Sequence, residues 1–550
     1  MNIASMRSGG ANYGVLRLDS ASKRAWAHIT IENGRMTMTR FASFVALVCL
    51  AAGAVFAQNL SVGSSTAQIP YPNPFKHIVL VIQENRTPDN LFHGLLSYPG
   101  INPANYDLAS SGLANVNGQE ETIPLVSNSL ATDFDLGHGH ADFTLMYDKG
   151  KMDGANQIPD QCNPTAQDCQ NGGKGEFLSY QFVQSSDVQP YLDIAAQYGW
   201  ANFFFQTNQG PTFAAHQYLF TGTSAQDAES DSEGVLVVGN PQAPKGANYS
   251  PLQDTGCLAP LNEYNWLISP QSAPQMYKLV NNPVGSLCFY HDTMATLLDD
   301  AGLTWKYYVV PQTSNPYPDD PTKKGYNVGG FLINAPNSIY DICQPDNVFQ
   351  NCNGPEYTTN VDLAPGDVLT DIANCNLPAV SWVTPIGQAS DHPGNVKGNE
   401  GPSWVSTVVD AIGNDTSCEH GAGYWSDTAI LIMWDDWGGW YDHVGPSIAP
   451  GVWAVNEHGF RVPFIAVSAY TPPAFVSNVP HDFGSVLRFV QGTMGFTEGA
   501  LGFADARATT DLREFFNFKM QPRPFQTINS PRNAEYFIND KRVPDPPDTY

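Results

Sequence analysis

Two short segments of this sequence combine side chains that bind divalent cations. Glu84-Asn85-Arg86 follows an apolar run that ends at Ile82, and Asp435-Asp436 follows a second apolar run that ends at Trp434. Carboxylate and carboxamide oxygens are hard ligands for divalent ions. Two adjacent carboxylates at the mouth of a buried strand also repel each other, which is costly unless a cation neutralises them. The predicted metal ligands are therefore Glu84, Asn85, Asp435 and Asp436.

Each segment also has an ordinary structural explanation. Asp and Asn cap helices and form turns, so either segment by itself fits a helix cap or an Asp-rich surface turn. The occurrence of such segments after two separate apolar runs favours a metal site. The residues leave the identity and number of the metal ions open, with Ca²⁺, Mg²⁺, Mn²⁺ and Zn²⁺ as candidates.

Thr212 is the candidate nucleophile. It follows Gly210-Pro211 and precedes a predicted helix. At the start of a helix, backbone N–H groups and the helix dipole favour an anion such as phosphate. A nearby metal ion lowers the pKa of such a hydroxyl and makes it a nucleophile for phosphorus. The simpler alternative is that Thr212 only caps the helix.

Several of the twelve histidines lie near these segments. A neutral imidazole binds metal, and a protonated one balances phosphate charge or protonates a leaving group. We predict catalytic roles for His138 and His392. Further candidates for contact with phosphate are Arg86, His140, His216 and His481. Any one of these histidines, taken alone, also fits a structural role.

The elements that must position these residues follow from the apolar pattern. Short runs rich in β-branched residues, predicted to be buried strands, occur at 77–82, 379–383, 429–434 and 464–468. Helical patterns lie between them, for example at 293–301 and 485–491. This alternation predicts an α/β fold with a mostly parallel central sheet and helices on both faces. Ligands in such folds bind at the carboxyl ends of strands, which is where the candidate residues occur.

The N-terminal end of the chain predicts export. Arg40, the uncharged run 41–55 and Ala57 resemble a signal peptide, so residues 1–57 are predicted to be an N-terminal extension plus signal peptide. This apolar run is too short for a stable membrane span. The catalytic domain is then expected at 58–507, with a Pro-rich tail at 508–550. The predicted localisation is secreted or periplasmic.

Cysteine content supports export. Of nine cysteines, Cys49 lies in the predicted signal peptide, and the other eight give an even number in an exported chain, which indicates disulfides. The short loops make Cys162–Cys169 and Cys343–Cys352 the expected pairs. Two regions, 225–285 and 311–365, are rich in Pro, Asn and Gly and are predicted to be long insertions over the sheet.

The charge of the chain restricts its partners. The formal net charge is −27 at pH 7 and the sequence pI is about 4.6. Such an acidic protein is repelled by nucleic acid and by anionic membrane surfaces. We therefore expect no nucleic-acid partner. The oligomeric state is left open.

Six ordered blocks resemble the bacterial phosphoesterase family of non-haemolytic phospholipase C and respiratory-burst-inhibiting acid phosphatase. The first block, which starts at Glu84-Asn85-Arg86, has Thr87 and Pro88 where the family usually has Ser and Phe. The other matching blocks are Asp135 to His138, Gly150-Lys151-Met152-Asp153-Gly154, Asp391-His392-Pro393, the segment from Asp435 to Val444, and the pair Arg461-Val462-Pro463 and His481 to Leu487. The resemblance spans roughly residues 74–495.

This resemblance implies an alkaline-phosphatase-like fold, metal ligands at Glu84, Asn85, Asp435 and Asp436, and a nucleophile at Thr212. The chain departs from the family after the nucleophile. Where the family usually has Pro-Asn followed by His or Arg, this chain has Ala214-Ala215-His216.

The expected function is hydrolysis of phosphate esters. We expect the enzyme to resemble an acid phosphatase, because few residues follow the last of the six matching blocks. The alternative is a phospholipase C that acts on phosphatidylcholine-type lipids through their headgroup. A third hypothesis is an exported binding protein that keeps the fold with weakened catalysis, supported by the changed residues after Thr212. A glycosidase lacks support, because the adjacent Asp435 and Asp436 cannot flank a sugar ring.

Overall fold

The computed structural model describes the main part of the chain together with four short N-terminal strands. The described residues are 73–162, 177–240, 256–259, 265–269, 288–310, 332–345, 351–395, 397–446 and 458–542. Residues 1–66 form one compact unit and residues 67–550 form another. In the first unit, β1 (Ser5–Ser8), β2 (Ala11–Val15), β3 (His28–Glu32) and β4 (Arg35–Met38) form an antiparallel sheet. The predicted cleavage site at Ala57 lies outside the described residues.

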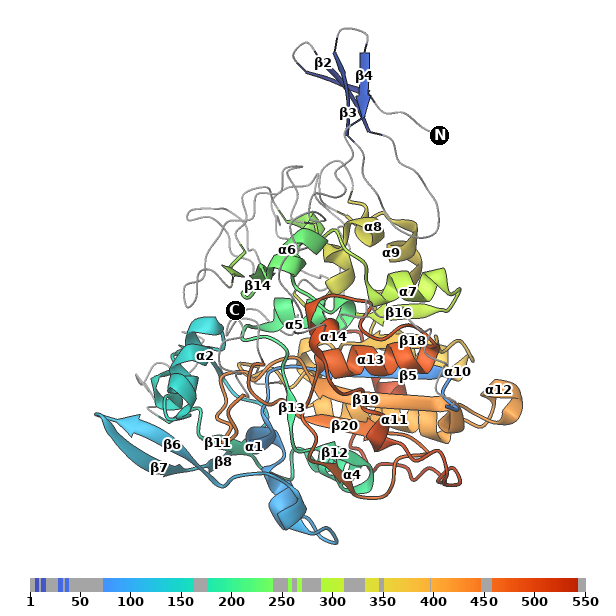
Figure 1. Cartoon of the computed structure of the whole chain (residues 1–550). Coiled ribbons are helices and arrows are strands. Elements are labelled where there is room, and N and C mark those ends of the chain that lie inside the picture. Colours follow the sequence, from blue (N-terminus) through green and yellow to red (C-terminus); the bar gives the residue numbers. More distant parts are fainter. Residues whose placement is uncertain are drawn as a thin grey trace, which may run out of the picture. The chain divides into compact units, whose positions relative to one another are not determined.

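An eight-stranded sheet forms the centre of the second unit (Figure 1). Its strands, in sheet order, are β17 (Val361–Asp362), β16 (Trp305–Tyr308), β18 (Val380–Val383), β5 (His77–Gln83), β19 (Thr428–Trp434), β20 (Phe464–Val467), β12 (Gly199–Ala201) and β21 (Phe475–Ser477). The first five strands are parallel to one another, and β20 is antiparallel to both of its neighbours. The prediction of a mostly parallel sheet is confirmed.

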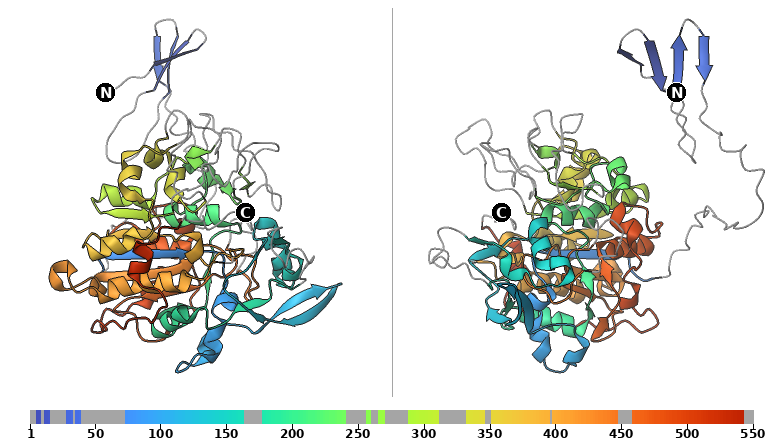
Figure 2. Two further views of the ribbon diagram at one scale, coloured as in Figure 1. Left: turned by 180° about the vertical axis from the view of Figure 1, so that it is seen from behind. Right: turned by 60° about the vertical axis from the view of Figure 1, so that its left-hand side comes forward.

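Strands β5 and β19 form the middle of the hydrophobic core. Every residue of both strands is buried, as expected for parallel strands that are covered on both faces. Helices α4 (Gln189–Gln197) and α11 (Gly401–Asn414) pack against each other, and α11 contacts β19. Helices α5 (Thr212–Thr221) and α13 (Phe483–Met494) form a second set with α7 (Met294–Asp300), and α5 contacts Trp382 of β18. Figures 1 and 2 show helices in front of the sheet and behind it.

Residues 508–542 are part of the same core and do not form a separate tail. Leu512, Phe515, Ile528 and Phe537 are buried in the main hydrophobic cluster. Helix α15 (Ala534–Ile538) packs against α10 (Asp367–Ala373) and α11. This segment therefore completes the hydrophobic core of the second unit.

Three cysteine pairs are at disulfide distance. They are Cys257–Cys288, Cys343–Cys352 and Cys375–Cys418. The predicted Cys343–Cys352 pair is confirmed, whereas the predicted Cys162–Cys169 pair involves Cys169, which lies outside the described residues. Disulfides are typical of an oxidising compartment, as predicted for an exported chain.

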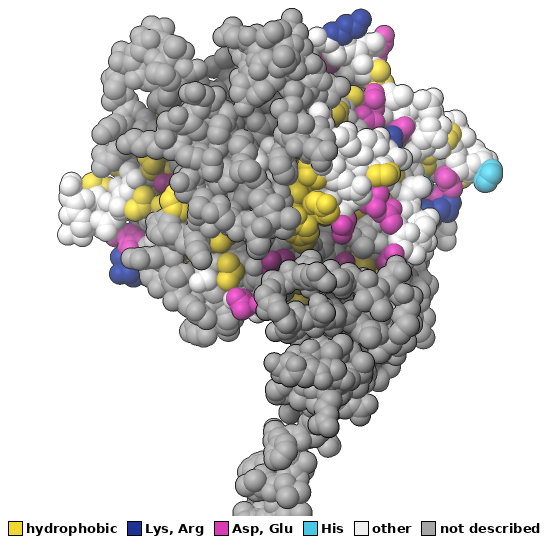
Figure 3. Space-filling model, turned by 90° about the horizontal axis from the view of Figure 1, so that it is seen from above, with side chains coloured by type: hydrophobic (Ala, Val, Ile, Leu, Met, Phe, Trp, Pro, Cys, Tyr) yellow, Lys and Arg dark blue, Asp and Glu magenta, His cyan; other side chains and the backbone are white. Residues whose placement is uncertain are grey.

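The described surface carries scattered acidic groups. On the face shown in Figure 3, Asp and Glu side chains are spread between isolated Lys and Arg side chains. Within the described part of the chain, no helix combines the length and apolar character that a membrane span requires. The spread of Asp and Glu side chains on this face agrees with the acidic composition.

Candidate metal and phosphate site

The two predicted ligand segments meet at one edge of the sheet. Strands β5 and β19 are parallel neighbours whose last residues, Gln83 and Trp434, are in register. The chain therefore reaches Glu84 and Asp435 at the same level. Backbone hydrogen bonds hold the segments together, with Asp435 N–H donating to the Gln83 carbonyl at 2.9 Å and Arg86 N–H donating to the Asp436 carbonyl at 3.0 Å.

Asp435 is oriented by the backbone around it. Its Oδ1 accepts hydrogen bonds from the N–H of Asn85 at 3.0 Å and of Asp436 at 2.7 Å. Its Oδ2 is buried and has no hydrogen-bond donor among the described residues, and the same holds for Asn85 Oδ1. Burial raises the pKa of Asp435 well above its ordinary value, and the charges of Asp436 and Glu84 raise it further. Buried acceptor oxygens of this kind fit a cation.

The backbone at this site has an unusual conformation. Asn85 has φ of 61°, in the left-handed region, which Asn tolerates better than most residues. Gly438, at φ of 60°, passes so close to Asn85 that a Cβ on it would lie 2.3 Å from the Asn85 carbonyl oxygen. Strained residues of this kind persist where the surroundings hold them, often at functional sites. The glycine of Asp435-Asp436-Trp437-Gly438 is thus needed for the two segments to touch.

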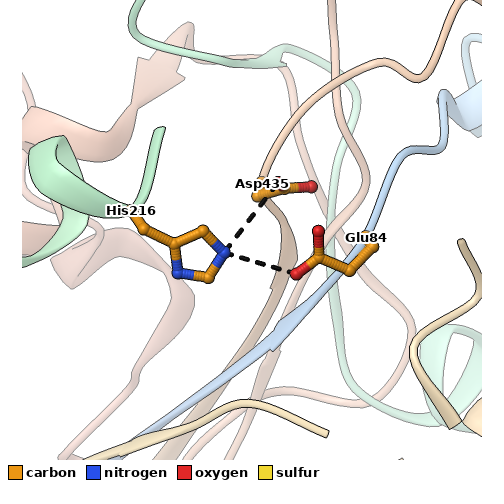
Figure 4. Close-up of side chains that lie close together, drawn as sticks. All are labelled: Glu84, His216 and Asp435. Carbon is orange, nitrogen blue, oxygen red and sulfur yellow. Dashed lines mark hydrogen bonds and ion pairs between the residues drawn. The ribbon is translucent and has the colours of Figure 1, made fainter. Parts of the chain in front are cut away.

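His216 reaches the same point from helix α5 (Figure 4). Its Nε2 lies 3.3 Å from Glu84 Oε1 and 3.9 Å from Asp435 Oδ2. One ligand atom from each of these three buried residues lies within 4.8 Å of the others. This donor set of two carboxylates and an imidazole fits a divalent metal ion. The sequence predicted His216 as a phosphate contact, and its position beside both carboxylates was not predicted.

Thr212 is the first residue of α5 and is fully buried. Its hydroxyl donates to Asp436 Oδ2 at 3.3 Å, while Asp436 Oδ1 accepts from Gly438 N–H at 2.8 Å. The structure therefore brings the predicted nucleophile into contact with a predicted ligand residue. Because Pro211 precedes the helix and provides no side-chain cap, Thr212 does not act as the N-cap residue here.

His138, His140 and His392, which the sequence predicts to act in catalysis or contact phosphate, lie near the two ligand segments. His138 Nδ1 donates to the Leu136 carbonyl at 2.7 Å, and its Nε2 lies 3.3 Å from Asn85 Nδ2. His392 Nδ1 donates to the Pro393 carbonyl at 2.6 Å, and its ring centroid is 6.3 Å from that of His138. His140 Nδ1 contacts the Gln209 carbonyl at 3.2 Å, and burial lowers the pKa of His140. His138 thus lies directly beside Asn85, a predicted metal ligand.

Arg86 and His481 are held by contacts of a structural kind. The Arg86 guanidinium donates to the carbonyls of Asp391, at 2.7 and 2.8 Å, and of Leu130, at 2.9 Å, and it lies over the Trp440 ring. The His481 ring contacts Thr510 Oγ1 at 2.8 Å and Glu514 Oε1 at 3.1 Å. Phosphate contact by these two residues stays a prediction.

Asp391 is a buried residue whose role the sequence did not assign. Its Oδ2 accepts from the Tyr191 hydroxyl at 2.7 Å and from Trp434 Nε1 at 3.2 Å. Burial raises the pKa of Asp391 to about 6. Asp391 has φ of 71° and directly precedes His392, so these contacts fix the loop that carries His392. In the sequence, the block Asp391-His392-Pro393 after a predicted strand indicated that this loop belongs to the site.

A second acidic cluster combines Asp442 and His443, which follow Gly438 and Gly439 in the chain, with Asp89 and Arg461. Arg461 donates to both carboxylate oxygens of Asp442, at 2.8 and 3.0 Å, and His443 Nδ1 lies 2.7 Å from Asp89 Oδ2. Asp89, Asp442 and His443 also lie close enough to hold a metal. Here the guanidinium and the imidazole already balance the carboxylates, so we interpret this cluster as an ion-pair network.

A family model described as the Phosphoesterase family matches residues 75–496. The chain belongs to this family. The family match confirms the resemblance predicted from the six sequence blocks, and it makes the chain a phosphoric ester hydrolase. The matched range contains every predicted catalytic and metal-binding residue.

Relatives of this phosphoesterase include several named phospholipases C. The chain is 23% identical to "Non-hemolytic phospholipase C" of Pseudomonas aeruginosa, over 92% of this chain and 67% of the relative. It is 23% identical to "Phospholipase C A" of Mycobacterium tuberculosis, over 81% of this chain and 78% of the relative. A solved structure of a protein in the alkaline phosphatase superfamily from Vibrio parahaemolyticus aligns over 72% of this chain and 71% of its own, with 12% identity and a TM-score of 0.27.

Proposed function

We propose that this phosphoesterase is an exported, metal-dependent enzyme that hydrolyses phosphate esters through Thr212. The observation that supports this most is the hydrogen bond from Thr212 Oγ1 to Asp436, at the sheet edge where Glu84, Asn85 and Asp435 converge. A pure binding protein does not need a buried hydroxyl beside buried carboxylates, because such a cluster is costly to bury. The residues that would hold the metal ion are Glu84, Asn85, Asp435 and Asp436.

In the proposed reaction, Thr212 Oγ1 attacks phosphorus in line with the leaving oxygen. The Oγ1–P bond forms and the bond from phosphorus to the leaving oxygen breaks. Asp436 Oδ2, at 3.3 Å, accepts the hydroxyl proton. His138 or His392 protonates the leaving oxygen, and water then hydrolyses the phospho-threonine. A divalent ion, when bound, supplies positive charge that lowers the pKa of the hydroxyl and balances the phosphate oxygens.

The substrate is proposed as a small phosphate ester, as for an acid phosphatase. The net charge of −27 opposes adsorption to anionic lipid, so an ester within an anionic membrane surface is not the expected substrate. Phospholipase C action on phosphatidylcholine is the second candidate, and the similarity to named phospholipases C favours phospholipase C action. Phosphatidylcholine carries no net charge, so the acidic surface does not repel it.

Kinetics of two Thr212 variants test the mechanism. Thr212→Ala should lower kcat by a factor of at least about 10³, since it removes the nucleophile, whereas Thr212→Ser keeps the hydroxyl and should retain measurable turnover. Wild type and variants are compared on a phosphomonoester, a phosphodiester and phosphatidylcholine from pH 4 to 8, with and without chelator. Normal turnover by Thr212→Ala would refute the mechanism, and the preferred substrate of the wild type decides between the two candidates.

A further inference from the structure

His216 lies four residues after Thr212 on α5, and the two side chains therefore face the same side of the helix. The nucleophile and the imidazole are positioned by one rigid element. Both residues are fully buried, as are Glu84 and Asp435 opposite them. Figure 4 shows the His216 ring pointing its Nε2 atom at the two carboxylates.

Tyr307 determines which nitrogen of His216 carries hydrogen. The Tyr307 hydroxyl lies 2.6 Å from the Ile333 carbonyl oxygen, which can only accept. The single hydroxyl hydrogen is used in that bond, so the oxygen acts as acceptor toward His216 Nδ1 at 3.1 Å. Nδ1 is thereby the N–H nitrogen, and in the neutral ring Nε2 presents its lone pair to Glu84 and Asp435.

A lone pair and two carboxylates that face one another repel unless a positive charge lies between them. Donor atoms that share one ion at about 2.1 Å lie about 3 to 4 Å apart. The Nε2 atom lies 3.3 Å from Glu84 Oε1 and 3.9 Å from Asp435 Oδ2, within this range. An imidazole that binds a metal typically donates its other N–H to an acceptor, which is the arrangement that Tyr307 provides.

We propose that His216 is a nitrogen ligand of the metal ion and that Tyr307 is its positioning residue. The site then prefers an ion such as Zn²⁺ over Mg²⁺ and Ca²⁺, because the latter favour oxygen donors alone. This inference rests on the proposed function for the presence of a metal, and it adds the ligand and the class of ion. The alternative is that a proton on Nε2 makes His216 an imidazolium that pairs with Glu84.

Calorimetric titration of the chelator-treated full chain with Zn²⁺ and, separately, with Mg²⁺ tests the proposal. We expect wild type to bind Zn²⁺ more tightly than Mg²⁺. His216→Gln should weaken Zn²⁺ binding by about 100-fold or more while changing Mg²⁺ binding by less than about 10-fold. Tyr307→Phe should weaken Zn²⁺ binding by about 10- to 100-fold, as loss of an outer partner typically does. His420→Gln, which changes an exposed histidine, is the matched control and should bind as wild type does.

A spectroscopic measurement on the wild type makes the test independent of how the variants fold. Pulsed EPR of the Mn²⁺-loaded chain should show coupling to a directly bound ¹⁴N nucleus, and this signal should be lost in His216→Gln. No nitrogen coupling in the wild type, or equal Zn²⁺ affinity in wild type and His216→Gln, would overturn the ligand assignment while Thr212-dependent turnover leaves the proposed function intact. A wild type that binds none of these ions would overturn both.

Discussion

His443 should make the stability of this phosphoesterase fall as the pH rises above neutrality. Burial alone would lower the pKa of His443, but the hydrogen bond and charge of Asp89, together with the charge of Asp442, raise it from 6.5 to about 9 against the opposing charge of Arg461. The ring also contacts Asp107 through Nε2 at 3.1 Å. The folded chain thus holds a proton that the unfolded chain releases near pH 6.5.

The size of the effect follows from the difference between the two pKa values. At about 1.36 kcal/mol for each pH unit, a rise from 6.5 to about 9 corresponds to about 3 kcal/mol. Because the pKa is raised on folding, this stabilisation is fully present below pH 6.5 and is lost as the pH rises through 9. Solvent lowers the value somewhat, since the His443 side chain is 27% exposed.

Urea unfolding of wild type and His443→Gln at intervals from pH 6 to 9.5 measures this contribution. The free energy of unfolding of wild type should fall by up to about 3 kcal/mol over this interval, and that of His443→Gln should fall much less. The exposed His420 provides a matched control, because His420→Gln should keep the wild-type slope. Parallel slopes for wild type and His443→Gln would refute the role assigned to the ion-pair network.

Two further substitutions test the packing of the second unit. Cys375→Ser opens the Cys375–Cys418 bridge. The separation of 43 residues predicts that the free energy of unfolding falls by about 4 kcal/mol, by the loop-entropy relation. Urea unfolding without reductant measures this loss, and an unchanged midpoint would contradict it. Gly401→Ala places a Cβ 1.9 Å from Asp391 Oδ1, so it should cost about 1 to 3 kcal/mol and lower kcat by displacing the loop that carries His392. Wild-type stability and turnover in Gly401→Ala would show that this loop tolerates displacement.

The central strands were predictable because their pattern is local. β5 and β19 are buried on both faces and therefore consist of continuous apolar residues that end in polar side chains. The predicted runs 77–82 and 429–434 differ from the observed strands by one residue at one end of each. The same pattern placed Glu84 and Asp435 at the carboxyl edge, which is where the structure has them.

The position of His216 was not predictable from such patterns. It depends on how α5 packs across the ends of two strands that are far away in sequence, and no local spacing encodes that distance. The role of residues 508–542 was hidden for a similar reason. Phe515, Ile528 and Phe537 show no strand or long-helix periodicity in the sequence, and only tertiary packing shows that they complete the core.

The changed residues after Thr212 affect the start of α5 but do not displace the proposed nucleophile. Ala214 and Ala215 stand where the family usually has Pro and Asn, and both are fully buried. Ala214 has a backbone N–H that proline lacks, and the adjacent Phe213 N–H donates to the Asn240 side chain at 3.1 Å. Ala215 in place of Asn therefore removes one polar side chain. Ala214 in place of Pro adds one backbone N–H donor to the first turn of α5. The hydrogen bond from Thr212 to Asp436 involves neither alanine, so the proposed nucleophile keeps this contact despite the two changes.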